Sequence, residues 1–268
     1  MAETLLRVAD MAAASGWAPG DTIDSPGIVN LVGDLEPHAE YWSPNVPGAP
    51  PLTDMLLADG GILENTGLIG LLRRKVRSVV VFLNTVTPLR PKYNACSTKA
   101  PGVNDVESQL AAWFGWQEYP SDESGFYYYN DHIFNQTDYC PFVKKIQAAQ
   151  ASGGGAVASM ELTTIDSKWW NIDAGMKVNM TLVYLSRTFG WEDKLTDSRV
   201  KWNALPLFNR DDPTSIPSSG PFKGFPHYST FGDLEMEANQ ANLLADLTGW
   251  VVKNNAGIFS QAFGEQAA

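Results

Sequence analysis

Two apolar runs separated by a short helical pattern are the clearest hydrophobic signal in this chain of 268 residues. The first run is Met55–Ala58, and the second, rich in β-branched residues, is Ser78–Leu83. Neither run alternates with polar residues, which is typical of strands covered on both faces. Between them, Gly67–Lys75 has helical spacing, with Asn65 or Thr66 as the N-cap and basic residues at its end. We expect a right-handed strand–helix–strand crossover with parallel strands.

This crossover places Asp59 at the carboxyl end of a sheet strand, where open α/β folds bind their ligands. Gly60 and Gly61 follow directly and allow the backbone to turn tightly beside the carboxylate. The same three residues are also common in ordinary turns. Asp59 is therefore a candidate catalytic residue whose alternative role is a structural turn.

The remaining pattern predicts further helices and strands in an α/β arrangement with a mixed, mainly parallel sheet. We expect one domain, or the C-terminal portion of one. It has a helix and an irregular connection over 1–51, a sheet core with helices over 52–187, a long loop over 188–232 and a helix over 233–255. The other predicted elements are a helix from Asn104 or Asp105 to Phe114, a helix from Pro141 ended by Gly153, and antiparallel strands Val157–Thr164 and Met176–Leu185 at the sheet edge.

An aromatic stretch lies between the two middle helices. Phe126, Tyr127 and Tyr128 are candidates for lining an acyl-chain pocket or contacting a lipid surface. The alternative is an aromatic strand packed on the core, because aromatic residues favour strands.

Charge and composition exclude several classes of protein. The formal net charge is −11 and the sequence pI is about 4.7, which argues against binding to nucleic acid and against attraction to anionic membranes. Charged residues interrupt the N-terminal segment, and no apolar run is long enough to span a membrane, so we expect neither a signal peptide nor a transmembrane segment. These features indicate a cytoplasmic protein.

The cysteines and carboxylates suggest no metal site. Cys96 and Cys140 are the two cysteines of the chain, and we expect buried free thiols in a reducing compartment. The acidic pairs, such as Asp211 with Asp212, have no His or Cys at ligand spacing and are typical of solvated loops. We therefore expect no metal and no cofactor.

The stretch LLADGGILENTGLIGLLRRKVRSVVVFLN, residues 56–84, resembles the aspartate segment of the patatin-like and cytosolic phospholipase A families. In these families a serine in a Gly-x-Ser-x-Gly turn is activated by one aspartate, without histidine. The resemblance implies that Asp59 is this base and that the fold has three layers, α/β/α. It also implies a lipid acyl hydrolase that acts on phospholipid or lysophospholipid.

The sequence departs from these families in lacking the nucleophile. It contains no Gly-x-Ser-x-Gly, and the 58 residues before Asp59 are too few for the oxyanion loop and the serine turn. The glycine run at 153–155 comes after the aspartate, so it reads as a turn between a helix and a strand. The chain therefore corresponds to the C-terminal half of such a hydrolase, and we expect it to be inactive alone.

Two alternatives remain. The first is a non-catalytic protein that binds lipid or a partner through a degenerate hydrolase fold. The second is a short serine esterase using Ser43 or Ser229, which lack the glycines of a serine turn. His38, His132 and His227 supply the imidazoles for such a triad, and each is interpreted as structural.

Overall fold

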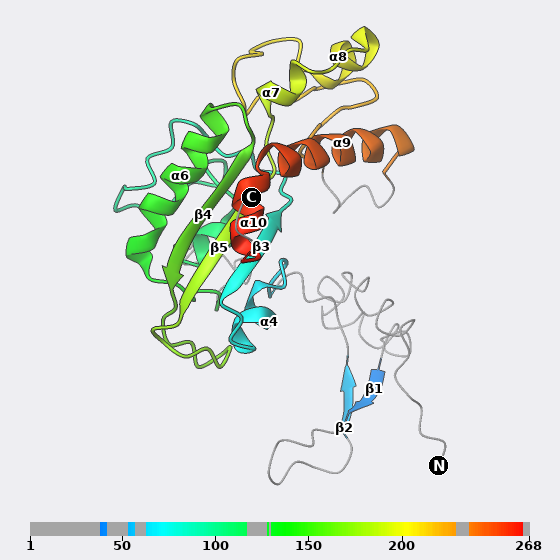
Figure 1. The fold of residues 1–268 in the computed structure, drawn as a ribbon. Coiled ribbons are helices and arrows are strands. Elements are labelled where there is room, and N and C mark those ends of the chain that lie inside the picture. The colour runs from blue at the N-terminus through cyan, green and yellow to red at the C-terminus, as the bar shows by residue number, and fades with distance from the viewer. Residues whose placement is uncertain are drawn as a thin grey trace. The chain divides into compact units, whose positions relative to one another are not determined.

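The computed structural model describes residues 38–41, 53–56, 63–116, 128, 130–228 and 236–264 (Figure 1). Its contacts divide the chain into two units, Met1–Asn65 and Thr66–Ala268.

The first unit contains an antiparallel strand pair, β1 (His38–Tyr41) and β2 (Thr53–Leu56). The predicted parallel pairing of Leu56–Ala58 with Val79–Leu83 is wrong in the described residues, because β2 pairs with β1 and the second run has another partner. β1 and β2 are close in sequence, so their pairing closes a short loop at a lower entropic cost than a crossover.

The second unit is built on a three-stranded sheet of β3 (Ser78–Leu83), β4 (Ala156–Thr163) and β5 (Lys177–Tyr184) in the order β3-β5-β4. β5 runs parallel to β3 and antiparallel to β4. The predicted strands and the mixed sheet are confirmed, and the architecture is broadly α/β. Among the described strands of this unit, parallel pairing does not dominate, and β5 lies at the centre because it has a partner on each side.

Hydrophobic cores lie on both faces of this sheet. Val79 and Val81 of β3 belong to one core, and Val80 packs against the other. The ring of Phe82 stacks on Phe259, with centroids 6.4 Å apart, yet it remains 48% exposed. The second face of β3 is therefore only partly covered, unlike the predicted doubly buried strand.

Helix α4 (Leu68–Arg73) confirms the predicted helix before β3. The backbone N–H of Leu68 donates to Thr66 Oγ1 at 3.3 Å, which is the predicted capping contact, although Gly67 occupies the N-cap position with a φ of 75°. Leu72 is buried in the core, so α4 fixes the start of β3 against the first face of the sheet.

Two further helices cover that face. α5 (Ser108–Ala112) begins after Glu107, so the predicted cap at Asn104 or Asp105 is wrong. The Asp105 carboxylate instead accepts the backbone N–H of Gly102 at 2.9 Å within its own turn.

A short 3-10 helix, η3 (Gln136–Asp138), leads into α6 (Tyr139–Ala151), which packs on β4. Pro141 lies in the first turn of α6, and Gly153 follows its end with a φ of 78°, both as predicted.

The segment predicted as a long surface loop contains two short helices, α7 (Phe189–Glu192) and α8 (Ser198–Ala204). Asp197 caps α8 by accepting the backbone N–H of Arg199 at 2.8 Å. Phe225 is almost fully buried in the second core, so this segment contributes packing as well as surface.

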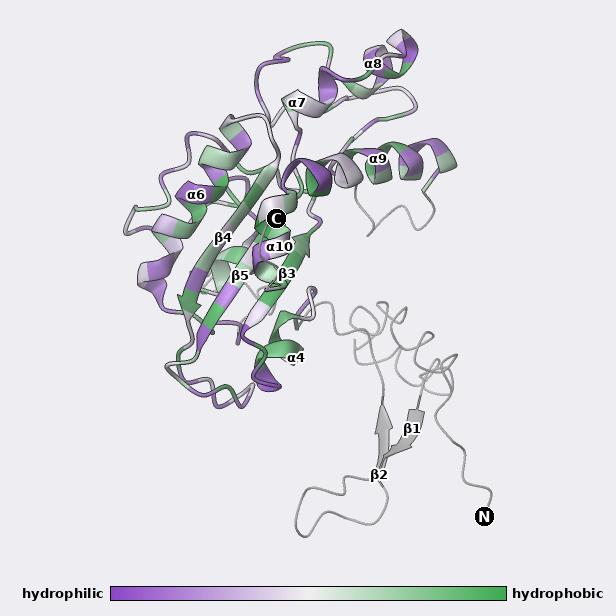
Figure 2. Cartoon of the chain, viewed as in Figure 1, coloured by the Kyte–Doolittle hydropathy of each residue, from purple (hydrophilic) through white to green (hydrophobic). Residues whose placement is uncertain are grey.

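The C-terminal helix is confirmed as α9 (Ala238–Asn254), which buries Leu247 and Val251 against the second face and alternates in hydropathy along its length (Figure 2). A further helix, α10 (Ala256–Ala262), follows beyond the predicted range of 233–255 and packs on β3 and β5. Phe259 is the buried residue that anchors α10, and the sequence pattern did not indicate it.

The expectation of two buried free thiols is wrong. Cys96 and Cys140 form a disulfide with Cα atoms 4.8 Å apart. Their separation of 44 residues is no obstacle, because the loop after β3 returns to the first turn of α6.

Among the residues that the structure describes, no helix combines the length and the apolar character needed to cross a membrane.

Candidate functional site

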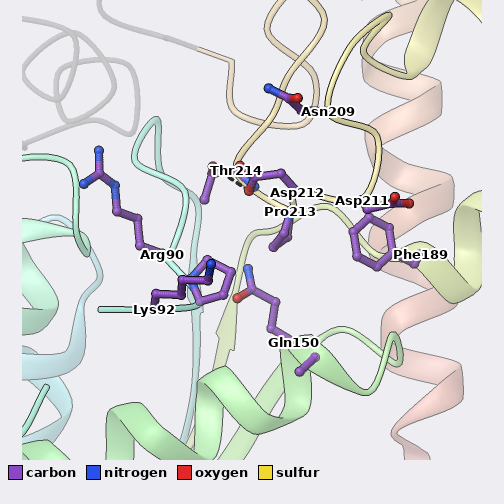
Figure 3. Close-up of a pocket in the computed structure, with 11 residues that line it drawn as sticks. Arg90, Lys92, Gln150, Phe189, Asn209, Asp211, Asp212, Pro213 and Thr214 are labelled. Carbon is purple, nitrogen blue, oxygen red and sulfur yellow. Dashed lines mark hydrogen bonds between the residues drawn. The ribbon is translucent and has the colours of Figure 1, made fainter. Parts of the chain in front are cut away.

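The candidate site lies where the two parallel strands end. The chain leaves β3 after Leu83 and β5 after Tyr184 at the same edge of the sheet. The segments that leave this edge, together with the end of α6, line a cavity of about 930 Å³ (Figure 3). Open α/β sheets bind ligands at this edge, and the volume suits a small molecule.

The cavity carries opposite charges on facing walls. Lys92 lies on the loop after β3, and Asp212 lies on the segment after β5. Figure 3 shows Lys92 extending toward the middle of the cavity and Arg90 pointing away from it. Arg90 instead pairs with Asp105, with Nη1 and Oδ1 3.4 Å apart. Lys92 therefore faces a cavity whose other wall carries the acidic residues Asp211 and Asp212.

Hydrogen bonds within its own loop keep the carboxylate of Asp212 ionised. Its Oδ1 accepts the backbone N–H of Thr214 at 2.9 Å and the Thr214 hydroxyl at 2.8 Å. The backbone hydrogen bond from Thr214 is the main cause that lowers the pKa of Asp212, and Arg187 and Lys92 lower it further. The carboxylate thus keeps its charge in mildly acidic solution.

Gln150, in the last turn of α6, presents an unusual acceptor. Its side chain is buried, and its Nε2 donates to the carbonyl of Leu89 at 3.3 Å. Its Oε1 has no hydrogen-bond partner among the described residues. Figure 3 shows this amide pointing between the loop that carries Lys92 and the loop that carries Asp212.

The buried side chain of Arg187 fixes the cavity wall that carries Phe189 and Asp212. Arg187 donates twice to the Glu192 carboxylate, from Nε at 2.8 Å and from Nη2 at 2.7 Å. Its Nη1 donates to the carbonyl oxygen of Asp212 at 3.0 Å, and its guanidinium lies 5.2 Å from the ring centre of Phe189. One side chain therefore holds both the aromatic residue and the acidic loop of the cavity.

Beside the same strand ends, His227 is buried in a structural position. Its Nδ1 lies 2.7 Å from the carbonyl oxygen of Thr85, which requires the proton on Nδ1. Burial lowers the pKa of His227 to about 4, so the ring is neutral at physiological pH. Its Nε2 has no partner among the described residues.

Most of the predicted site residues lie outside the part of the chain that the structure describes. Asp59, Gly60 and Gly61 lie outside the described residues, as do Phe126 and Tyr127.

Tyr128 is described. It has a φ of 59°, and its carbonyl accepts the backbone N–H of Asp131 at 3.0 Å, which is a turn rather than a strand. Nearby, Ile133 and Phe134 are fully buried, so that end of the aromatic stretch packs on the core.

The sequence pattern missed most of the cavity. The pair Asp211 and Asp212 was interpreted as solvated, and Gln150 looks like an ordinary helix residue. Arg187 carried the best available signal, since it is the first charged residue after the apolar run that ends β5. Among the described residues, no cluster of His, Cys, Asp or Glu could hold a metal ion.

No protein-family model, curated protein or solved structure matches this chain.

Proposed function

We propose that this chain is the part of a lipid acyl hydrolase that carries the catalytic aspartate, Asp59, and that the nucleophilic serine lies outside these 268 residues. One observation carries the proposal. The segment after Asp59-Gly60-Gly61 folds into helix α4 and strand β3 of an α/β unit, in the order that the resemblance implies. The proposed substrate class is phospholipid or lysophospholipid. The three-layer α/β/α fold that the resemblance implies is part of the same proposal.

The proposed chemistry needs few groups. The serine hydroxyl attacks the ester carbonyl while Asp59 accepts its proton, and backbone N–H groups stabilise the oxyanion. The alcohol leaves with a proton, and water then hydrolyses the acyl-enzyme with the carboxylate again as base. An aspartate with an ordinary pKa near 4 is a weak base, so it must be desolvated and within about 2.6–3.2 Å of the hydroxyl.

One further feature of the second unit supports this role. Among the described residues, β3 is an edge strand of its sheet and carries the half-exposed Phe82. A hydrolase with a further strand beside β3 would cover that edge.

The proposal is tested first by the reading frame upstream of Met1. We expect an in-frame Gly-x-Ser-x-Gly preceded by a glycine-rich loop. We also expect the 268-residue chain alone to hydrolyse neither p-nitrophenyl esters nor lysophospholipids. Esterase activity of this chain that survives Asp59→Asn would overturn the proposal and direct attention to Ser43, Ser229 and the three histidines.

The second candidate is a non-catalytic protein that binds lipid or a partner. The cavity favours it, because no serine or cysteine is among the described residues that line its walls. Ligand binding by the chain, together with no upstream serine turn, would support this candidate over the hydrolase.

A further inference from the structure

A second pocket, of about 240 Å³, lies at the opposite edge of the sheet, where β3 and β5 begin. It is formed by the end of α4 and by the turn that precedes β5, which Figure 1 shows near α4. Three cations line it: Arg73, Lys75 and Arg77. Asp173 is the one carboxylate among the described lining residues, which leaves a net charge of +2. The pocket is thus locally positive in a chain whose net charge is −11.

The guanidinium groups of Arg73 and Arg77 are available to a ligand, because neither forms a hydrogen bond or an ion pair within the part of the chain that the structure describes. The Lys75 ammonium lies 2.9 Å from the Asp173 carboxylate, and the two side chains are 73% and 76% exposed. Exposed pairs contribute little stability, and an ammonium has three donors, so Lys75 can bind a further anion. The helix dipole accounts for cations in the last turn of α4, whereas Arg77 lies beyond the helix, directly before β3.

The backbone at Lys75 also points to a binding role. The N–H of Val76 donates to the carbonyl of Leu71 at 3.2 Å, and the N–H of Lys75 donates to the carbonyl of Leu72 at 2.8 Å. Helices that end in this way usually have glycine at the position of Lys75, whose φ is 60°. A lysine in this conformation lowers stability relative to glycine, and such strain is common at functional sites. Helix termination therefore does not explain this lysine, whereas anion binding does.

We propose that this pocket binds a phosphate dianion, either inorganic phosphate or the phosphoryl group of a monoester, through Arg73, Lys75 and Arg77. A phosphate monoester carries roughly two negative charges at neutral pH, which matches the net charge of the pocket, whereas a carboxylate carries one. Arginine binds phosphate oxygens with two parallel hydrogen bonds, and a volume of about 240 Å³ suits one such group. The inference is independent of the proposed hydrolase, because it uses none of the residues assigned to that activity.

Isothermal titration calorimetry of the 268-residue chain in a phosphate-free buffer tests the inference. The ligands are inorganic phosphate, methyl phosphate and acetate. We expect saturable binding of both phosphates, at least about tenfold tighter than that of acetate, because charge-assisted hydrogen bonds to a dianion are stronger. Tighter binding of methyl phosphate would identify a monoester as the ligand, and tighter binding of inorganic phosphate would identify the free ion. No saturable binding, or equal binding of acetate, overturns the proposal.

Matched variants separate the pocket from general electrostatic attraction. Arg73→Gln and Arg77→Gln should each weaken phosphate binding about tenfold. Arg74→Gln removes the same charge from the same helix end and should leave binding nearly unchanged. Arg74 does not line the pocket, and its Nη1 already donates to the carbonyl of Gly70 at 2.8 Å. If Arg74→Gln weakens binding as much as Arg73→Gln, the affinity belongs to the surface charge and the pocket is not a site.

Two further variants keep the test independent of folding. Lys75→Gly should weaken binding without lowering the melting temperature, because glycine suits the left-handed backbone at this position. Asp173→Asn should tighten binding, since it removes the carboxylate that competes for Lys75, whereas Asp193→Asn, outside the pocket, should not. Unchanged binding in Lys75→Gly, or weaker binding in Asp173→Asn, would contradict the proposed arrangement of charges.

Discussion

At the scale of single residues, His227 makes the fold sensitive to acid. Its folded pKa of about 4 lies below the ordinary value of 6.5, because burial disfavours the charged ring. The stability that depends on the neutral ring is complete above pH 6.5 and is lost as the pH falls toward 4. A shift of this size corresponds to roughly 3 kcal/mol at most.

His227→Asn tests this directly, because the Asn amide can still donate to the Thr85 carbonyl. We expect the free energy of unfolding in urea to fall less between pH 7 and pH 4.5 in this variant than in the wild-type chain. His132→Asn is the control, since its side chain is exposed and should contribute less. An unchanged pH dependence in His227→Asn would contradict the assignment.

The Arg187–Glu192 pair is the second residue-scale test. Both side chains are buried, at 2% and 7% exposure. Arg187→Ala leaves an unpaired buried carboxylate, so we expect a loss of about 3–5 kcal/mol in unfolding free energy. Arg187→Met combined with Glu192→Leu should lose less, because no charge is left behind. Glu161→Gln, which breaks an exposed pair with Lys177, should change stability by less than about 1 kcal/mol.

At the scale of elements, the disulfide joins the cavity loop to α6. Cys96→Ser with Cys140→Ser should lower the free energy of unfolding by about 2–4 kcal/mol, since the bond closes a loop of 44 residues. Urea unfolding with and without dithiothreitol measures the effect. The reductant should destabilise the wild-type chain and leave the double variant unchanged, and an insensitive wild type would show that the bond contributes nothing.

The elements that the sequence predicts well are those with local signals. β3, α6 and α9 have continuous hydrophobic patterns, and Pro141 and Gly153 mark the two ends of α6. The elements that it misses depend on distant contacts. α10 is stabilised by Phe259 against the sheet, a contact that no local periodicity reveals.

The cavity was missed for the same reason. Gln150 and Asp212 are far apart in the sequence, and only the packing of α6 on the sheet brings their segments to one edge. The disulfide also depends on this arrangement. The spacing of 44 residues along the chain does not predict the bond, because Cys96 and Cys140 come together only when the loop after β3 meets the first turn of α6.

At the scale of the whole molecule, the net charge of −11 and the disulfide bear on where and how the protein works. Disulfides persist in oxidising compartments and are rare in the cytosol, so the cysteines no longer support the expected reducing environment. The net charge of −11 also argues against a general attraction to anionic membranes.

The most direct measurement is the rate of lysophospholipid hydrolysis by a chain extended upstream through its serine turn, compared with its Asp59→Asn variant. We predict turnover in the extended chain and a loss of about 10²–10⁴-fold in kcat for Asp59→Asn, because a general base contributes on this order. Circular dichroism should show both proteins equally folded, and Asp54→Asn, in the same segment, should keep its activity. Undiminished turnover in a folded Asp59→Asn variant would contradict the catalytic role of this aspartate.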